Sequence, residues 1–501
     1  IDKFVSGLVI ARNESNQGFL KNCNNAAKKA RGEYIFFLNN DTTVQKDWLP
    51  PLIKLLESDE SIGMVGSKLI YPDGRLQEAG GIIWSDGSGW NYGRCDDPNK
   101  PEYNYVRDVD YISGAAIMLS RKLWEEIGGF DTRYAPAYCE DSDLAFEVRK
   151  RNLRVVYQPL SVVTHFEGVS NGTDVNGTGL KRYQVENNKK LQEKWSEEFK
   201  NQYDNVGVPN AFRARERSRG KKVILFVDHY VPTFDKDAGS KTTFQYIKMF
   251  IERGYVVKFL PDNFAKSEPY TSILEQMGVE VLYGNEMRTN IFEWIENNQP
   301  NIDIAYLNRP HIATKYIDFI KEHPNVNIVI QVSDFTKDLR EKLIAGTMDL
   351  VWAMTEPPNP QNFQRILEKD VPIVFVAHPD HPLAGKKVSL RKILAEQLIV
   401  ADREVGYTYY LNKFANDIGM QLEPTLEVGS VAAIVNILEG GYGVSYLPWF
   451  VVEKPVADGK LATIDVTCPD PELKSSIICH KSKWIDPVIK KFIEYVDAGI
   501  K

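Results

Sequence analysis

Short apolar runs alternate with amphipathic segments over the first two hundred residues, and this pattern predicts a sheet covered by helices. Apolar runs that end at polar residues predict strands at 34–38, 64–71, 112–119 and 155–157. Periodic segments between them predict helices at 22–31, 48–58, 121–127 and 142–151. Pro72, Asp73 and Gly74 lie between two extended runs, so we also expect a hairpin there. The expected fold class is therefore α/β.

The same alternation resumes near residue 222. A strand at 222–228, a helix at 239–253 and a strand at 256–260 predict a Rossmann-like βαβ arrangement. The first loop of this arrangement lacks the G-x-G-x-x-G spacing, so the pattern gives no reason to expect a bound dinucleotide. From residue 326 onward, further strands and helices predict another open α/β domain.

These patterns predict three domains and one linker. The stretch 206–221 is basic and has no apolar period, which indicates a solvated linker. We expect a first domain at 1–205, the linker at 206–221, a Rossmann-like unit at 222–322 and a third domain at 323–501. The strand and helix predicted at 301–322 could instead open the third domain, and an artificial join near residue 323 is the other alternative.

Composition narrows the class of protein. A chain of 501 residues with 43% hydrophobic and 26% charged residues is expected to form several soluble globular domains. Its net charge of −7 lacks the basic footprint of a nucleic-acid-binding protein. The five cysteines are scattered without CxxC spacing, which argues against a zinc site or a disulfide framework. No apolar run is long enough to span a membrane. We expect a cytoplasmic protein, with association at the inner face of the membrane as an alternative.

The most informative run of residues is the predicted strand 34–38, because polar residues follow it at once. Asn39, Asn40 and Asp41 would lie at the carboxyl edge of a sheet, where ligands commonly bind. Asp41 offers hard oxygen ligands that suit Mg²⁺ or Mn²⁺. The alternative is that these three residues only form the turn that ends the strand.

A second acidic cluster follows about a hundred residues later, and Asp141 within it is our candidate for a general base. A helix dipole at this position would lower the pKa of Asp141, whereas burial or the neighbouring Glu140 would raise it. The alternative is that Glu140 and Asp141 only cap a helix. His165 follows an apolar run and could complete a metal site through an imidazole nitrogen, although a structural role is the simpler reading.

The order and spacing of several motifs resemble the family 2 glycosyltransferases with the GT-A fold, of the rhamnosyltransferase-like kind. The matching stretches are 12–19, 32–42, 63–66, 113–115, 128–131 and 138–144. The resemblance places Asn39, Asn40 and Asp41 at the family's DxD metal and nucleotide-sugar motif. Such enzymes normally begin with one more strand and loop, so we expect a GT-A domain that is truncated at its N-terminus.

The same resemblance implies roles for further residues. Asp141 would be the base of an inverting displacement, and Glu140 would lie on the acceptor side. His165 would complete the metal site, and Asn16 and Gly18 would line the donor pocket. A divalent metal, Mg²⁺ or Mn²⁺, is the implied cofactor.

The rest of the chain resembles two other families. Residues 222–322 are similar to the N-terminal half of a GT-B glycosyltransferase, and residues 323–495 resemble the effector-binding domain of LysR-type regulators, a periplasmic-binding-protein-like α/β module. The second resemblance would place a small ligand against Arg403, Thr408, Gly429 and Ser430, although loop and hinge geometry is an equal explanation for these residues. No basic recognition helix accompanies this module, so we expect no nucleic-acid partner.

We therefore expect an inverting, metal-dependent glycosyltransferase of surface polysaccharide synthesis. Its donor would be a nucleotide-diphosphate sugar and its acceptor a saccharide or a lipid-linked saccharide. The alternatives are a module that only binds a small molecule, and an inactive chimera.

Overall fold

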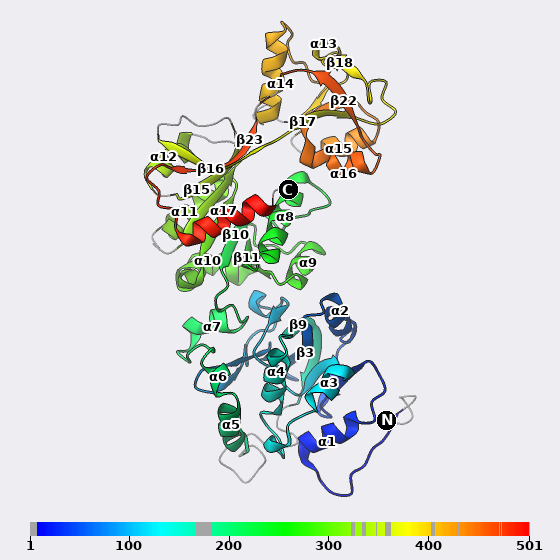
Figure 1. The fold of residues 1–501 in the computed structure, drawn as a ribbon, viewed down its shortest axis with the longest axis vertical. Coiled ribbons are helices and arrows are strands. Elements are labelled where there is room, and N and C mark those ends of the chain that lie inside the picture. The colour runs from blue at the N-terminus through cyan, green and yellow to red at the C-terminus, as the bar shows by residue number, and fades with distance from the viewer. Residues whose placement is uncertain are drawn as a thin grey trace. The chain divides into compact units, whose positions relative to one another are not determined.

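The computed structural model describes residues 8–166, 183–321, 326–332, 337–346, 348–355, 362–401, 406–428, 431–469, 471 and 473–499. The chain forms two compact units (Figure 1). The first unit contains residues 1–220 and takes in the later segment Leu274–Glu280, and the second unit contains the remaining residues.

A mixed sheet forms the centre of the first unit. Its strands follow in the order β1 (Tyr34–Leu38), β8 (Ala116–Ser120), β3 (Ile62–Ile70), β9 (Arg154–His165) and β2 (Thr42–Val44). β3 and β9 are parallel, and the other neighbours along this order are antiparallel. The predicted hairpin is confirmed, because β4 (Leu76–Glu78) returns antiparallel to β3. A second hairpin joins β5 (Gly81–Ile83) to β6 (Gly89–Asn91), and β7 (Arg107–Asp108) pairs with β9.

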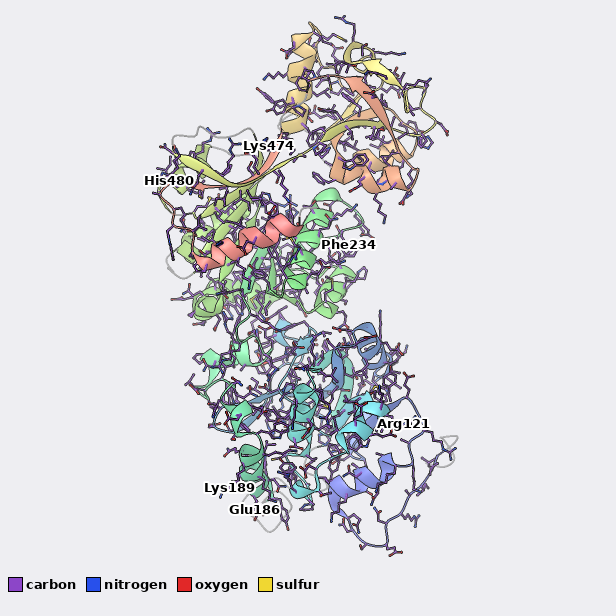
Figure 2. All side chains as sticks on the ribbon, viewed as in Figure 1. Arg121, Glu186, Lys189, Phe234, Lys474 and His480 are labelled. Carbon is purple, nitrogen blue, oxygen red and sulfur yellow. The ribbon has the colours of Figure 1, made fainter. Side chains whose placement is uncertain are left out.

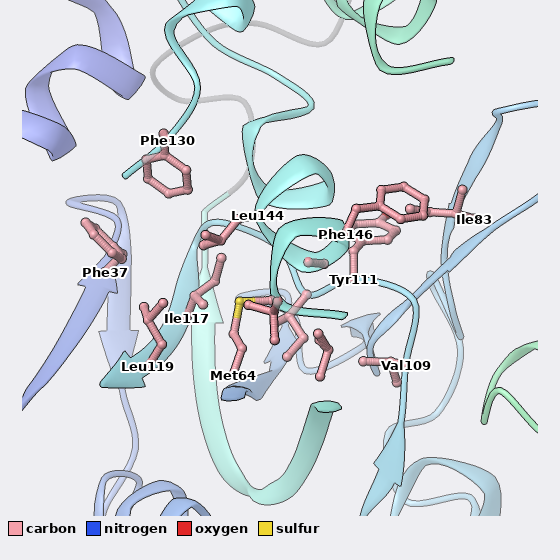
Figure 3. Packing of buried hydrophobic residues seen from close by; sticks show 14 of the residues in the cluster. Phe37, Met64, Ile83, Val109, Tyr111, Ile117, Leu119, Phe130, Leu144 and Phe146 are labelled. Carbon is pink, nitrogen blue, oxygen red and sulfur yellow. The ribbon is translucent and has the colours of Figure 1, made fainter. Parts of the chain in front are cut away.

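Helices cover both faces of this sheet. The helices of this unit are α1 (Gly18–Ala27), α2 (Pro50–Ser58), α3 (Arg121–Ile127), α4 (Glu140–Lys150), α5 (Tyr183–Lys194), α6 (Ser196–Phe199) and α7 (Val208–Ala214), of which α7 packs against the β5–β6 hairpin. Because side chains alternate along a strand, Met64 of β3 joins a core with Ile117 and Leu144 (Figure 3), whereas its neighbour Val65 packs with Leu52 of α2. Each fully buried side chain of this kind contributes roughly 1.5–3 kcal/mol to folding.

The bounds of several elements in this unit differ from the sequence prediction. α1 lies at Gly18–Ala27 and not at 22–31, and β9 continues well beyond residue 157. The helix expected at 142–151 begins at Glu140, so Asp141 lies inside its first turn. The strand expected at 112–119 begins only at Ala116, and the residues before it form a loop. α3 has the predicted bounds, and Gly128 ends it in the left-handed conformation with φ 90°.

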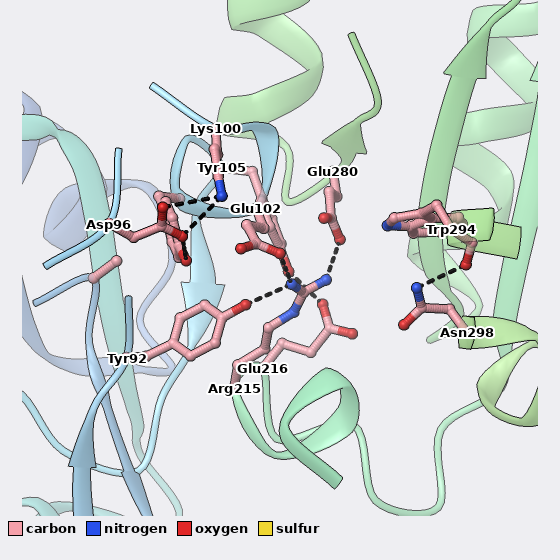
Figure 4. Close-up of polar contacts among 12 residues, drawn as sticks. Tyr92, Asp96, Lys100, Glu102, Tyr105, Arg215, Glu216, Glu280, Trp294 and Asn298 are labelled. Carbon is pink, nitrogen blue, oxygen red and sulfur yellow. Dashed lines mark hydrogen bonds and ion pairs between the residues drawn. The ribbon is translucent and has the colours of Figure 1, made fainter. Parts of the chain in front are cut away.

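The stretch 206–221 is not a solvated linker, and this prediction was wrong. It contains α7, and Arg215, Glu216 and Ser218 beyond that helix are buried. The guanidinium of Arg215 donates to Glu280 at 2.6 Å and to Glu102 at 2.9 Å (Figure 4). A basic residue can be buried when carboxylates neutralise it, and those partners are far away in the sequence.

An eight-stranded sheet forms the first part of the second unit. Its order is β12 (Glu280–Val281), β11 (Val256–Pro261), β10 (Val223–Asp228), β13 (Ile304–Asn308), β14 (Asn327–Val332), β15 (Leu350–Thr355), β23 (Lys474–His480) and β16 (Phe363–Asp370). The strands from β11 to β15 in this order are parallel, and β23 is antiparallel to both of its neighbours. The accompanying helices are α8 (Ala238–Glu252), α9 (Tyr270–Gln276), whose last three residues belong to the first unit, α10 (Asn285–Asn298), α11 (Pro310–Lys321), α12 (Lys337–Ile344) and α17 (Pro487–Gly499).

This sheet runs across the expected boundary between 222–322 and 323–501. β13 lies before that boundary and β14 after it, and the two strands pair along their length. The strand at 304–308 therefore belongs to the same sheet as the strands that follow it, and α11 packs against β13 and β14. The predicted division of the chain into domains otherwise stays a prediction.

The C-terminal part of the second unit has a smaller sheet of its own. Its order is β18 (Lys387–Ser389), β22 (Ala462–Thr467), β17 (Ile373–Ala377) and β21 (Val444–Pro448). Around it lie α13 (Leu390–Ile393), α14 (Gly406–Asp417), α15 (Val431–Glu439) and α16 (Trp449–Ala457), with the short pair β19 (Ile399–Val400) and β20 (Leu426–Glu427). The chain enters this lobe between β16 and β17 and leaves it between β22 and β23, which gives a two-lobed module. The predicted α/β fold class is confirmed.

None of the helices in the described ranges combines the length and the apolar character that crossing a membrane requires.

Candidate active site

An open cavity of about 730 Å³ lies in the first unit. Its walls come from the end of β1, the β5–β6 turn, the loop before β8, the start of α4, the end of β9 and α5. Predicted site residues from three distant stretches of sequence line this one cavity, namely Asp41, the adjacent pair Glu140 and Asp141, and His165. Asn39 lines it as well.

Strand pairing brings Asp41 to His165. β2 is antiparallel to β9, and Thr42 faces His165 directly. The turn before β2 is held by the Thr42 hydroxyl, which donates to the carbonyl of Asn39 at 2.6 Å. As a result, His165 Nε2 lies 3.4 Å from Asp41 Oδ1. On the other side of the ring, His165 Nδ1 lies 2.9 Å from the amide oxygen of Gln77. If Nδ1 donates to that oxygen, the lone pair is on Nε2, which is the arrangement of a metal ligand.

Asp41 and His165 fit a divalent cation as part of its ligand set. Their separation of 3.4 Å allows both to reach one ion, and carboxylate plus imidazole is a donor set that Mn²⁺ accepts. Within the described residues, no group of three His, Cys, Asp or Glu side chains could hold a metal by itself. Mg²⁺ and ions like it usually take only one or two carboxylates and complete their shell with water and substrate phosphates.

Asp141 is held by two backbone donors at the start of α4. Its Oδ2 accepts from Gly114 N at 3.0 Å, and its Oδ1 accepts from Ser142 N at 2.7 Å. Burial raises the pKa of Asp141, and these two hydrogen bonds act in the opposite direction. Because burial has the larger effect, the carboxylate is a better proton acceptor than an exposed aspartate would be.

Glu140 is buried beside it, with a relative exposure of 6%. Burial and the neighbouring Asp141 carboxylate raise the pKa of Glu140 to about 8. At pH 7 this side chain is therefore mainly neutral, and the acidic cluster carries less charge than its sequence indicates.

Glu140→Gln is expected to stabilise the first unit at neutral and alkaline pH. The folded-state pKa of Glu140 is raised above its ordinary value of 4.5, so the stability it contributes is full below pH 4.5 and is lost as pH rises through about 8. Glutamine avoids that loss, which is on the order of 3 kcal/mol at pH 7. The gain in stability is measured by urea unfolding at pH 5 and pH 8, with hydrogen exchange of the β3 amides as the probe of the first unit. The exposed Glu57→Gln on α2 is the control, and equal stabilisation at both pH values would contradict the prediction.

The other predicted donor-binding residues lie elsewhere. Asn16, Gly18 and Asn40 are not among the residues that line the cavity. Asn16 Oδ1 accepts from Gly18 N at 2.9 Å where α1 begins. Gly18 has φ +72°, and a Cβ there would come within 2.8 Å of Pro136. These contacts explain, without any ligand, why an asparagine and a glycine occupy these positions. The part of both residues in donor binding stays a prediction.

Of the predicted effector-binding residues, Arg403, Gly429 and Ser430 lie outside the described residues. Thr408 is buried in α14, and its hydroxyl donates to the carbonyl of Ala401 at 3.3 Å. A role of these residues in ligand binding also stays a prediction.

Several cavity residues were missed in the sequence. The Glu78 carboxylate accepts from Ser113 N at 2.9 Å, which fixes the loop that also holds Asp141. The hydroxyl of Tyr111 donates to Asn91 Oδ1 at 2.9 Å. Lys189 is an exposed cation on α5 (Figure 2) that lines the cavity. The one available signal was the polar pair Gln77 and Glu78 in the second strand of the expected hairpin, and the structure buries both side chains.

Two families of known proteins match this chain in separate places. The model of glycosyl transferase family 2 matches residues 1–126, and that of the LysR substrate binding domain matches residues 315–500. The resemblances predicted for the two ends of the chain are thereby confirmed. The likeness of 222–322 to half of a GT-B enzyme stays a prediction.

Curated relatives also divide between the two ends. The O-antigen biosynthesis protein RfbC of Myxococcus xanthus is 32% identical over 157 residues, which cover 30% of this chain and 12% of that protein. The HTH-type transcriptional activator CmpR of Synechocystis is 28% identical over 184 residues, which cover 36% of this chain and 59% of that protein. The regulatory domain of CcmR from Synechocystis, solved with 2-PG, covers 40% of this chain and 97% of that domain with 23% identity and a TM-score of 0.30.

Proposed function

We propose that the first unit transfers a sugar from a nucleotide-diphosphate sugar to a saccharide acceptor, with inversion at the anomeric carbon. The observation that carries this proposal is that Asp41, His165 and Asp141 line one cavity. The match to glycosyl transferase family 2 over residues 1–126 supports it, and that range includes Asp41.

Each group of residues would serve one half of the reaction. Asp141, with its raised pKa, would take the proton of the attacking acceptor hydroxyl. Asp41 and His165 would hold a divalent cation, which when bound neutralises the diphosphate leaving group. A base and a leaving-group site in the same cavity are what a single displacement requires, and a single displacement inverts the anomeric carbon.

The pathway proposal rests on a relative. RfbC is named as an O-antigen biosynthesis protein, and its similarity to this chain supports a place in surface polysaccharide assembly. A saccharide or a lipid-linked saccharide is the acceptor that fits such a pathway. Lys189 on the cavity wall offers a positive charge to a diphosphate, whether in the donor or in the acceptor.

The test is donor hydrolysis and transfer with UDP- and dTDP-sugars in the presence of Mn²⁺. Asp41→Asn is expected to weaken Mn²⁺ activation by at least about tenfold, because it removes the charged metal ligand but keeps the size of the side chain. Asp47→Asn is the matched control, since Asp47 is exposed and its φ of 58° suits asparagine. Equal Mn²⁺ dependence in both variants would rule out the metal assignment. No turnover by the unaltered chain with any donor would rule out the enzyme.

We also infer that the C-terminal part of the second unit binds a small organic molecule. The LysR substrate binding domain match over 315–500 and the two-lobed architecture support this. A ligand of the folded state raises the melting temperature, because it stabilises that state by an amount that grows with the logarithm of its excess over Kd. Thermal shifts of the second unit with a panel of small carboxylates and phosphates test this, and the absence of any shift at millimolar ligand would count against binding.

A further inference from the structure

The parallel sheet of the second unit has a topological switch point at β10. From β10 the chain passes through α8 to β11 on one side, whereas β13 pairs with the opposite side of β10. In open α/β sheets, ligands bind outside the carboxyl ends of the strands at such a point. The residues at the ends of β10 and β13 are therefore the ones to consider.

These two strand ends carry an interconnected polar cluster. Asp228 ends β10 and is buried, with 3% relative exposure. Its Oδ1 accepts from Arg309 Nε at 2.8 Å, and its Oδ2 accepts from Asn308 Nδ2 at 2.7 Å and from Thr243 Oγ1 at 2.8 Å. Asp228 thus holds the residues that end β13 in a fixed position.

Arg309 is held in an unfavourable backbone conformation. Its φ is +90°, a value that a side chain of this size rarely adopts. Within the described part of the chain, only Nε of its guanidinium makes a hydrogen bond, so Nη1 and Nη2 have no such partner there. Gly239 leaves room beside these atoms, because a Cβ at that position would lie 3.1 Å from Nη2. Strain of this kind at a fixed, partly exposed cation is typical of a binding site.

Two imidazoles complete the cluster. His229 follows Asp228 directly, and its ring lies 6.0 Å from that of His311 on α11. His229 Nδ1 is buried and lies 3.5 Å from Asp228 Oδ1, and it makes no hydrogen bond among the described residues. The positive charge of Arg309 disfavours the binding of a metal ion beside these imidazoles. In the described ranges, no three metal-binding side chains come together.

The carboxylates nearby do not oppose an anion strongly, because donors surround them. Besides Asp228, two other acids lie nearby. Asp262, whose backbone N donates to the Asp228 carbonyl, is paired with Lys315. Asp237 Oδ1 accepts from Ser240 N at 2.7 Å. Its Oδ2 accepts from the hydroxyls of Thr233 and Tyr230 at 3.1 and 3.3 Å. Nη1 and Nη2 of Arg309 are therefore the charged donors in this cluster that are available to bind a ligand.

We propose that the switch point at β10 and β13 binds the phosphate group of a small phosphorylated molecule. Arg309 Nη1 and Nη2 form a planar fork that matches two phosphate oxygens, and His229 and His311 supply further donors. Asp228 is a positioning residue, because it touches the guanidinium and not the ligand. This site is separate from the cavity of the first unit and does not depend on sugar transfer.

Calorimetric titration of the full chain with inorganic phosphate and with glycerol 3-phosphate tests the proposal. Arg309→Gly removes the fork, so we expect at least tenfold weaker binding. Its relaxed φ offsets part of the stability that is lost when the buried Asp228 carboxylate loses its cation. Arg309→Lys keeps the charge but not the fork and is expected to weaken binding as well. Lys248→Gln, at an exposed position of α8, should leave binding unchanged.

The two probes distinguish the sources of the phosphate. Tighter binding of the ester than of inorganic phosphate indicates a phosphorylated metabolite, whereas equal binding indicates phosphate alone, and both results support a phosphate site. The proposal is overturned if the unaltered chain binds neither probe at 10 mM, if both Arg309 variants bind as it does, or if Zn²⁺ binds in place of phosphate.

Discussion

Asp141→Asn is expected to lower the rate of sugar transfer by about 10²–10⁴-fold, the usual contribution of a general base. Asparagine keeps the size of the side chain, and its amide oxygen can still accept from Gly114 N or Ser142 N. The α4 start should therefore keep its fold. What is lost is the proton acceptor for the acceptor hydroxyl. Single-turnover transfer with a saturating donor measures this, because donor binding should change little.

The pH profile separates a base from a structural aspartate. A general base works in its deprotonated form, and burial raises the pKa of Asp141. The acid limb of the transfer rate should therefore lie at higher pH than the pKa of an ordinary aspartate. Asp73→Asn, at the exposed turn of the β3–β4 hairpin, is the control and should leave both rate and profile unchanged. A D141N variant that transfers at the unaltered rate would remove Asp141 from the mechanism.

The first part of this site was predictable because it depends on local sequence. The apolar run at 34–38 is uninterrupted, and β1 has the predicted bounds. The polar residues after it could only end the strand, which placed Asp41 at an edge of the sheet. The start of α4 was two residues in error, because the first turn of a helix that begins at Glu140 and Asp141 has no apolar period to mark it.

The contacts of the site were not predictable, because they depend on strand register. The 3.4 Å between Asp41 and His165 follows from the pairing of Thr42 with His165, two residues that are far apart in the sequence. Gln77 contacts His165 for a similar reason, since its hairpin packs beside β9. A single sequence does not show such long-range pairs. The motifs therefore predicted that a cavity exists, but not which residues contact one another in it.

The burial of the basic stretch at 206–221 was also not predictable, because it depends on contacts with residues that are far away in the sequence. Its charge predicted exposure, because an unpaired guanidinium in a protein interior is strongly unfavourable. The partners that make burial favourable are 113 and 65 residues away from Arg215 in the sequence. The sequence gives the charge of a residue but not which carboxylate lies beside it in the fold. The burial of Arg215 could therefore be found only in the structure.

Arg215→Met is therefore expected to destabilise the first unit by about 3–5 kcal/mol, the usual result of removing one partner from a buried ion pair. The side chain of Arg215 is 3% exposed and that of Glu280 is 1% exposed, so the variant leaves a buried carboxylate without its cation. Glu102 and the hydroxyl of Tyr92 lose the same donor. Because Glu280 belongs to the segment Leu274–Glu280, that segment should also lose protection. Hydrogen exchange of peptides from 62–120 and 274–280 measures both effects.

The double variant Arg215→Met, Glu280→Gln separates lost charge from lost packing. If the destabilisation comes mainly from the uncompensated carboxylate, removing that charge should restore a large part of the lost stability, because a neutral amide is less costly to bury than a carboxylate. Arg121→Met is the control, since Arg121 forms an exposed pair with Glu125 that contributes about 0–1 kcal/mol. Equal stability losses in the single and double variants would show that the aliphatic packing of Arg215, and not its pairing with Glu280, stabilises this part of the first unit.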